Sequence, residues 1–331
     1  MFRKTTKVLK VLFLGVACML YGSVGWADSG PLKLSLASFT QGSGWHVMAQ
    51  TMAKLIKSAL PPGSQVDALP YSGGVANPML MDQGKADMAL GFPMETGLAI
   101  KGELPYKKKI PDLRLLVGNL DTYWYVFSVR EGLPIMSFQD IKAKKYPLRL
   151  VVMPMGSSGE WATSRVLASY GITYSDIVAW GGKVSHVSFP TAVEMMQDGQ
   201  ADAFGNQCTP GHSSWMQLTN STKVRFLPID KGVAQDLETK YGFHPGNFPK
   251  GIFPGVDRDI PVLSFATCLI TTTKMSNDLA YKVTKAICTN KEALALAYEG
   301  SKAFDPNKAA QVSLPLHPGA EKYYREAGTI K

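Results

Sequence analysis

Cysteine and histidine are scarce in this sequence. Four cysteines occur in 331 residues, and no two have the Cys-x-x-Cys spacing typical of zinc and redox sites. None of the five histidines lies at metal-ligand spacing from another histidine or an acidic residue. The sequence therefore predicts neither a metal site nor a disulfide framework. Two of Cys208, Cys268 and Cys288 could still pair in an oxidising compartment, and three buried thiols fit the sequence equally well.

Motifs of catalysis and of nucleotide binding are also missing. The sequence contains no phosphate-binding Gly-x-x-x-x-Gly-Lys-Ser/Thr and no dinucleotide fingerprint. Segments 156–159 and 211–215 combine glycine with serine, but neither places Gly-x-Ser-x-Gly directly after a strand, as a nucleophile elbow requires. We therefore expect no catalytic residue, no cofactor and no enzymatic activity.

Long apolar runs are absent except near the N-terminus. Four basic residues precede the apolar run 11–20, and Gly25-Trp26-Ala27 supplies small residues where a signal peptidase cleaves. We predict a signal peptide over residues 1–27, cleavage after Ala27 and a periplasmic mature chain. Its removal lowers the formal net charge from +9 to +5. Lys107-Lys108-Lys109 is then the only basic cluster, so we expect no nucleic-acid partner.

Two segments share the order of an apolar strand, a loop rich in glycine and serine, and a helical pattern. The first runs through 32–37, 38–46 and 47–60, and the second through 148–153, 154–159 and 161–170. At the same offset, Gly-x-Ala-Asp follows at 84–87 and at 199–202. The first N–H groups of a helix carry partial positive charge, and small residues let an anion approach them. The repeat indicates two similar α/β lobes with a shared cleft, or two ordinary strand-to-helix turns in one sheet.

Other loops offer backbone donors, hydroxyl groups and aromatic rings. The Tyr71–Gly74 loop precedes a helical pattern over 75–82, and Phe92 follows an apolar strand at the end that faces the crevice in open α/β sheets. Such loops suit a pocket that binds a small acid without transforming it, although core packing is the alternative for each aromatic residue. The candidate ligand-binding residues are Ser38, Ser43, Gly44, Trp45, Tyr71, Gly74, Phe92, Ser157, Ser158, Gly159, Asn206 and Gln207.

The rest of the pattern alternates strands and helices, as in an α/β fold. We predict a loop over 92–95, a strand over 176–180 and an ordered surface loop over 241–259. The β-branched run 260–273 is long enough to return as a hinge strand.

An ordered series of motifs resembles the TAXI family of solute-binding proteins, which serve TRAP-type transporters. Tyr71–Asn77 stands at the family's Thr-Gly-Gly-Ser-x-Glu-Asn loop, and Gly84–Asp87 at its Gly-Glu-Ala-Asp. Pro154–Glu160 resembles its Pro-x-Gly-Ser-Gly-Thr-Glu loop, and the closest match is Pro315–Glu321. The resemblance covers nearly the whole mature chain.

This resemblance implies a two-lobed type II periplasmic-binding-protein fold with a central cleft and hinge strands. It divides the chain into lobe 1 (28–122), lobe 2 (123–262), and a hinge strand with a return to lobe 1 (263–331). It also implies a small organic carboxylate as ligand, such as an amino acid or a dicarboxylate, and the TRAP membrane permease subunits as partners. We expect a monomer.

The sequence departs from the family in loops that form the pocket. Trp45-His46 replaces the usual Tyr-Tyr, and Phe92-Pro93 stands where the family often has Gln-Ser. A more apolar acid is expected if these rings face the ligand, and the usual ligand if they pack behind the site. The functional alternatives are a periplasmic sensor subunit without a transport role, an enzyme on the same fold, and a basic surface-adhesion protein.

Overall fold

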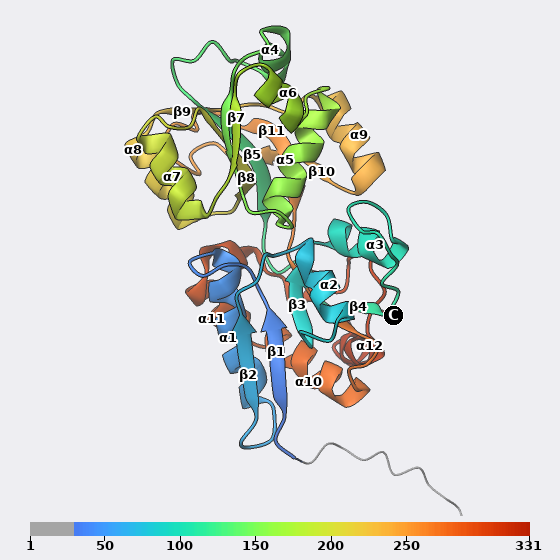
Figure 1. The fold of residues 1–331 in the computed structure, drawn as a ribbon. Helices are drawn as coiled ribbons and strands as arrows, with labels where there is room; N and C mark the ends of the chain where they lie inside the picture. The colour runs from blue at the N-terminus through green and yellow to red at the C-terminus, as the bar shows by residue number, and fades with distance from the viewer. Residues whose placement is uncertain (1–29) are drawn as a thin grey trace, which may run out of the picture.

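The computed structural model describes residues 30–331, and the predicted signal peptide lies outside them. This part of the chain forms two α/β lobes, one above the other in Figure 1. The sheet of the first lobe consists of β1 (Lys33–Ala37), β2 (Gln65–Leu69), β3 (Met88–Gly91), β4 (Leu113–Val117) and β12 (Cys268–Thr272). Their order in this sheet is β2-β1-β3-β12-β4.

The second lobe has a seven-stranded sheet. Its strands are β5 (Tyr123–Arg130), β6 (Arg149–Val152), β7 (Lys183–His186), β8 (Ala203–Cys208), β9 (Val224–Phe226), β10 (His244–Phe248) and β11 (Ile260–Phe265). The order is β10-β11-β5-β8-β6-β7, and β9 pairs with β5 outside this path.

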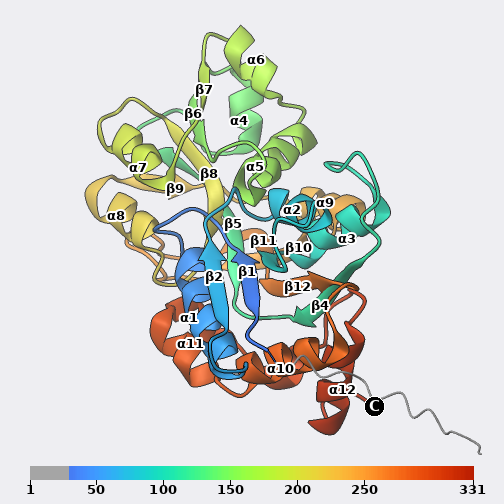
Figure 2. The same cartoon turned by 60° about the horizontal axis from the view of Figure 1, so that its bottom comes forward.

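Helices cover both sheets. The first lobe contains α1 (Gly44–Ser58), α2 (Ala76–Asp82), α3 (Pro93–Lys101), α10 (Asn277–Cys288), α11 (Lys291–Ala297) and α12 (Pro318–Glu326), with two short 3-10 helices at Glu299–Ala303 and Pro306–Lys308. The second contains α4 (Phe138–Ala143), α5 (Ser158–Ser169), α6 (Tyr174–Ala179), α7 (Phe189–Gln197), α8 (Ser213–Ser221) and α9 (Lys231–Tyr241). Figure 2 shows α10 and α11 along the outer side of the first lobe, where both contact α1. None of the helices in residues 30–331 is both long and apolar enough to cross a membrane.

The two lobes share one plan. Strand β1 runs parallel to β2 and β3, as β6 runs parallel to β7 and β8. In each lobe a strand from a distant part of the chain then pairs in the antiparallel sense, β12 with β3 and β5 with β8. The chain passes between the lobes twice, after β4 and again at residues 266–267. The predicted two-lobed α/β fold is therefore confirmed.

The internal repeat has a structural basis. Gly84 and Gly199 follow α2 and α7, and both adopt left-handed conformations, with φ of 69° and 70°. The carboxylates of Asp87 and Asp202 accept backbone N–H groups of β1 and β6 at 2.8 and 2.9 Å. These copies lie in different sheets, so the repeat reflects two lobes rather than two turns in one sheet.

Residues 176–179 belong to helix α6, so the predicted strand over 176–180 is wrong. Thr173 and Asp176 form a capping box, in which each side chain accepts the backbone N–H of the other residue. This helix-start signal outweighs the β-branched Ile177 and Val178, which favoured a strand.

Three further segments differ from the prediction. Helix α3 replaces the predicted loop over 92–95, because Pro93 suits a first helical position and Glu95 lies in the first turn. Edge strand β10 occupies part of the segment 241–259, where pairing with β11 outweighs the low strand propensity of its proline and glycine. The run 260–273 is not one strand but β11 and β12, which lie in different sheets.

Candidate functional site

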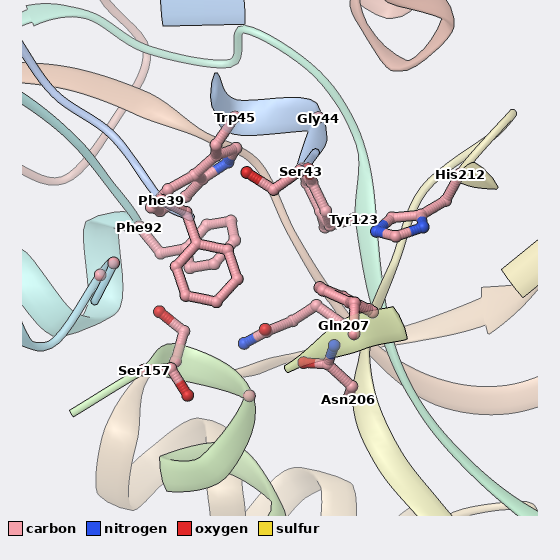
Figure 3. Close-up of a pocket in the computed structure, with 15 residues that line it drawn as sticks. Phe39, Ser43, Gly44, Trp45, Phe92, Tyr123, Ser157, Asn206, Gln207 and His212 are labelled. Atoms are coloured by element: carbon pink, nitrogen blue, oxygen red, sulfur yellow. The ribbon is translucent and has the colours of Figure 1, made fainter. Parts of the chain in front are cut away.

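A pocket lies between the two lobes (Figure 3). It contains about 400 Å³ of empty space, solvent at its opening included, and fifteen described residues line it. Ten of the twelve candidate residues are among them: Ser43, Gly44, Trp45, Gly74, Phe92, Ser157, Ser158, Gly159, Asn206 and Gln207. The structure thus brings together loops that are more than 100 residues apart in the sequence.

Helices α1 and α5 begin at this pocket from opposite lobes. The N-cap residues Ser43 and Ser157 each accept the backbone N–H of the residue three positions on, both at 3.2 Å. The N–H groups of the first two residues of each helix have no acceptor within the helix, and they form the positive end of its dipole. The first turns of both helices therefore line the pocket, and a helix N-terminus favours an anion.

The position of α1 is fixed by its apolar face. Met48, Met52 and Ile56 recur every four residues along the helix and are at most 1% exposed. Their burial in the core of the first lobe holds the first turn of the helix at the cleft.

Aromatic rings form much of the remaining wall. The ring of Phe92 lies 4.8 Å from Trp45 and 5.6 Å from Tyr123, measured between centroids. Phe39 of the first lobe meets Phe189 of the second edge-on at 6.4 Å. The rings of Trp45 and Phe92 therefore both line the pocket and pack against each other.

Three buried polar side chains of the second lobe have an atom without a hydrogen-bond partner among the described residues. These atoms are Asn206 Nδ2, Gln207 Nε2 and His212 Nδ1, and their residues are 1%, 8% and 6% exposed. Burial lowers the pKa of His212 to about 4, so its ring is neutral at neutral pH. An unpaired buried polar atom costs free energy, which an occupant of the pocket would recover by hydrogen bonding. Figure 3 shows the two amide side chains beneath Ser43 and Trp45, across the pocket from α1.

A buried carboxyl group, Glu95 of α3, lies directly behind the pocket. Its Oε2 accepts a hydrogen bond from the Ser158 hydroxyl at 2.7 Å, which links the two lobes. A Cβ atom at Gly74 would lie 2.1 Å from both of these oxygens, so only glycine leaves room for them. Burial raises the pKa of Glu95 to about 8, and the side chain is therefore protonated at neutral pH.

A hydrogen-bonded chain joins the pocket to both crossings between the lobes. The indole N–H of Trp45 donates to the Thr267 hydroxyl at 2.8 Å, and that hydroxyl donates to Asp121 Oδ2 at 2.8 Å. The Thr267 N–H also donates to Asp121 Oδ1 at 2.8 Å. Asp121 belongs to the first crossing and Thr267 to the second, so their side chains tie the two together. Burial raises the pKa of Asp121 to about 7.

Two candidate residues do not line the pocket. The Ser38 hydroxyl is fully buried and donates to the Leu69 carbonyl at 3.0 Å. Tyr71 is half-buried and packs against the core of the first lobe. Neither has a place in the pocket wall.

The sequence did not single out five lining residues: Phe39, Gly73, Tyr123, Phe189 and His212. Phe39 and Gly73 lie inside loops that were already recognised, so the loops themselves were the signal. His212 follows β8 closely, but the sequence favoured a packing or surface role for it. Nothing in the sequence pointed to Phe189, which begins α7 in the second lobe and packs against His212 and, in the first lobe, against Phe39.

Within residues 30–331, the structure shows neither a cluster of potential metal ligands nor a disulfide bond. No three His, Cys, Asp or Glu side chains of this region gather as potential metal ligands. Cys208, Cys268 and Cys288 are buried free thiols, which resolves the alternatives that the sequence left open.

Solved structures with a similar fold include a periplasmic binding protein. MatC from Rhodopseudomonas palustris, solved with bound malate, matches with a TM-score of 0.56 and 13% sequence identity over 90% of this chain and 98% of that chain. The periplasmic binding protein BugD matches with a TM-score of 0.51 and 12% identity, again over 90% of this chain and 98% of that chain. At these identities the likeness shows the fold, which is the periplasmic-binding-protein fold that the sequence predicts. The sequence model of the NMT1-like family matches residues 36–328, nearly all of the described chain, and the protein therefore belongs to the NMT1-like family.

Proposed function

We propose that the protein is a periplasmic solute receptor of the TAXI type, which captures a small organic carboxylate and delivers it to a TRAP-type membrane transporter. One observation carries the proposal: the N-termini of α1 and α5 converge on a single pocket from different lobes. Backbone donors at helix N-termini bind carboxylates without a buried arginine. The malate in the structurally similar MatC supports the same class of ligand.

The mechanism we propose is closure by population shift. Contacts from both lobes reach one ligand only when the lobes are close together, so the ligand binds the closed form more tightly than the open form. The transporter then recognises the closed shape. Among the described lining residues, no serine hydroxyl is hydrogen-bonded to His212, so the pocket has no paired nucleophile and base. We therefore propose binding without chemical change.

Ligand identification tests the binding step. The mature chain is purified under native conditions and denatured, and the released small molecules are identified by mass spectrometry. We expect a carboxylic acid, and its readdition to refolded protein should reduce the radius of gyration in small-angle scattering. Saturable binding with an unchanged radius of gyration would contradict closure.

A charge reversal at the helix N-terminus tests how the anion is held. Ser43→Asp keeps a residue that caps helices well but places a carboxylate beside the first N–H groups of α1. We expect the identified acid to bind at least about tenfold more weakly, as a loss of about 1.4 kcal/mol implies. Ser276→Asp is the matched control, because Ser276 caps α10 in the same way. Equal affinity in both variants would contradict the proposed anion site.

Delivery is tested in the source organism. Deleting the gene should abolish uptake of the radiolabelled acid, and a plasmid copy should restore it. Normal uptake combined with a lost transcriptional response to the acid would support the sensor role instead.

A further inference from the structure

The pocket has no partner for a second charge. None of its fifteen described lining residues is Lys, Arg, Asp or Glu. A ligand with two carboxylates, or with a carboxylate and an ammonium group, would bury one charge without an ion partner, and this is costly. The lining therefore favours a ligand with one negative charge.

The N-termini of α1 and α5 are not equivalent binding positions for that charge. At α5, the first turn already contains the acidic residue Glu160, and the Ser158 hydroxyl donates to the Glu95 carboxyl and is not free for a ligand. The first turn of α1 contains no acidic residue, and Ser43 is 4% exposed at its start. The carboxylate of the ligand therefore binds more favourably at the N-terminus of α1 than at that of α5.

The space beyond α1 is bounded by rings and by uncharged donors. Phe39 and Phe92 of the first lobe and Phe189 of the second all line the pocket. Phe39 meets Phe189 edge-on, and the His212 ring lies 4.6 Å from Phe189. Such walls favour a flat ring, which can meet them edge-on or in an offset stack. Opposite α1, Asn206 Nδ2 and Gln207 Nε2 are buried donors without a partner among the described residues. A carbonyl, hydroxyl or ether oxygen on the ligand would satisfy them without adding charge.

We propose, on the basis of the solute-receptor function above, that the pocket selects an aromatic monocarboxylate. Its carboxylate lies at the N-terminus of α1, its ring lies among Phe39, Phe92 and Phe189, and any further polar group is uncharged and faces Asn206 and Gln207.

Calorimetry with matched acids tests this selectivity. The mature chain is unfolded to remove any carried ligand and then refolded, and its fold is checked by circular dichroism. We expect benzoate and 4-hydroxybenzoate to bind at least about tenfold more tightly than terephthalate, which adds a second carboxylate, and than hexanoate, which lacks the ring. Benzamide, which lacks the charge, should not bind measurably.

Tighter binding of succinate, malate or glutamate would overturn the selectivity but leave the receptor function intact. Equal affinity for hexanoate and benzoate would overturn the preference for a ring. If no acid in the panel binds, both the selectivity and the receptor function fail.

A change of preference provides the second test. Gln207→Lys supplies a cation opposite α1, so the affinity for terephthalate relative to benzoate should rise at least about tenfold. Gln217→Lys is the control, because Gln217 is exposed on α8. An unchanged preference in folded Gln207→Lys would contradict the placement of the ligand.

Phe189→Leu tests the ring contact independently of added charge. It should weaken benzoate binding severalfold more than hexanoate binding, because it replaces the aromatic ring by an aliphatic side chain. Equal weakening of both acids would show that the pocket does not distinguish a ring.

Discussion

Replacing Glu95 by glutamine should change how stability depends on pH. Relative to the original protein, the free energy of unfolding of the variant should rise as the pH rises. Burial raises the pKa of Glu95 from 4.5 to about 8 in the folded chain. Between these two values the unfolded chain has lost a proton that the folded chain keeps, so raising the pH favours unfolding. The free energy of unfolding falls by up to about 1.4 kcal/mol per pH unit in this window, and the loss levels off above the folded pKa.

Glutamine can still accept the Ser158 hydroxyl but cannot ionise, so it removes this dependence. Between about pH 6 and pH 8, the free energy of unfolding of Glu95→Gln should gain about 2 kcal/mol relative to the original protein. Urea denaturation at three pH values and constant ionic strength measures this difference. Asp121, whose pKa is raised to about 7, contributes in the same direction in both proteins and cancels from the comparison.

A second glutamate variant is the control for the Glu95→Gln measurement. Glu103→Gln replaces an exposed glutamate just beyond the end of the same helix, so it separates the effect of the buried position from that of losing a glutamate. If the original protein and Glu95→Gln show parallel pH dependence, Glu95 is not a buried neutral acid in solution, and the assignment of its charge is wrong.

Three further outcomes follow from the geometry. Gly74→Ala should weaken ligand binding at least about tenfold in calorimetry, because its Cβ displaces the Glu95–Ser158 pair; Gly232→Ala, with open space around it, should not. Thr267→Val should lower the free energy of unfolding, measured in urea, by about 2–4 kcal/mol, since it leaves the Trp45 indole N–H and a buried Asp121 oxygen without a hydrogen-bond partner. Thr273→Val, at an exposed threonine, is the control, and equal losses in both variants would contradict the role of these hydrogen bonds. The native mature protein should not react with a thiol-specific chromogenic reagent until urea unfolds it, because Cys208, Cys268 and Cys288 are buried. Burial also raises the pKa of Cys288 to about 12, which keeps its thiol protonated. Rapid reaction of the native protein would contradict the burial of these cysteines.

Local chemistry made the cleft loops predictable. The predicted loops 38–46 and 154–159 contain Ser43 and Ser157, which cap α1 and α5, and Gly84 follows α2 in the left-handed conformation. Local reasoning failed at α6, where the sequence predicted a strand and the capping box of Thr173 and Asp176 was not recognised. Nothing in the sequence itself showed how the two lobes would meet.

The residues that depend on contact between the lobes were therefore missed. Phe189 meets Phe39 of the other lobe edge-on, and Glu95 of the first lobe has its hydrogen-bond partner, Ser158, in the second. Conversely, Ser38 lies in the right loop, but its hydroxyl points into the lobe toward the Leu69 carbonyl. A residue's loop can be inferred from local signals, whereas the direction of its side chain depends on partners far along the chain.

The bond between Asp121 and Thr267 has a mechanical consequence. It fastens the two inter-lobe connections to each other, so one pair of side chains restrains the backbone at both crossings. Trp45 is hydrogen-bonded to Thr267 of this pair and also forms part of the pocket wall. A molecule that displaced the indole would therefore break a hydrogen bond to the connection between the lobes.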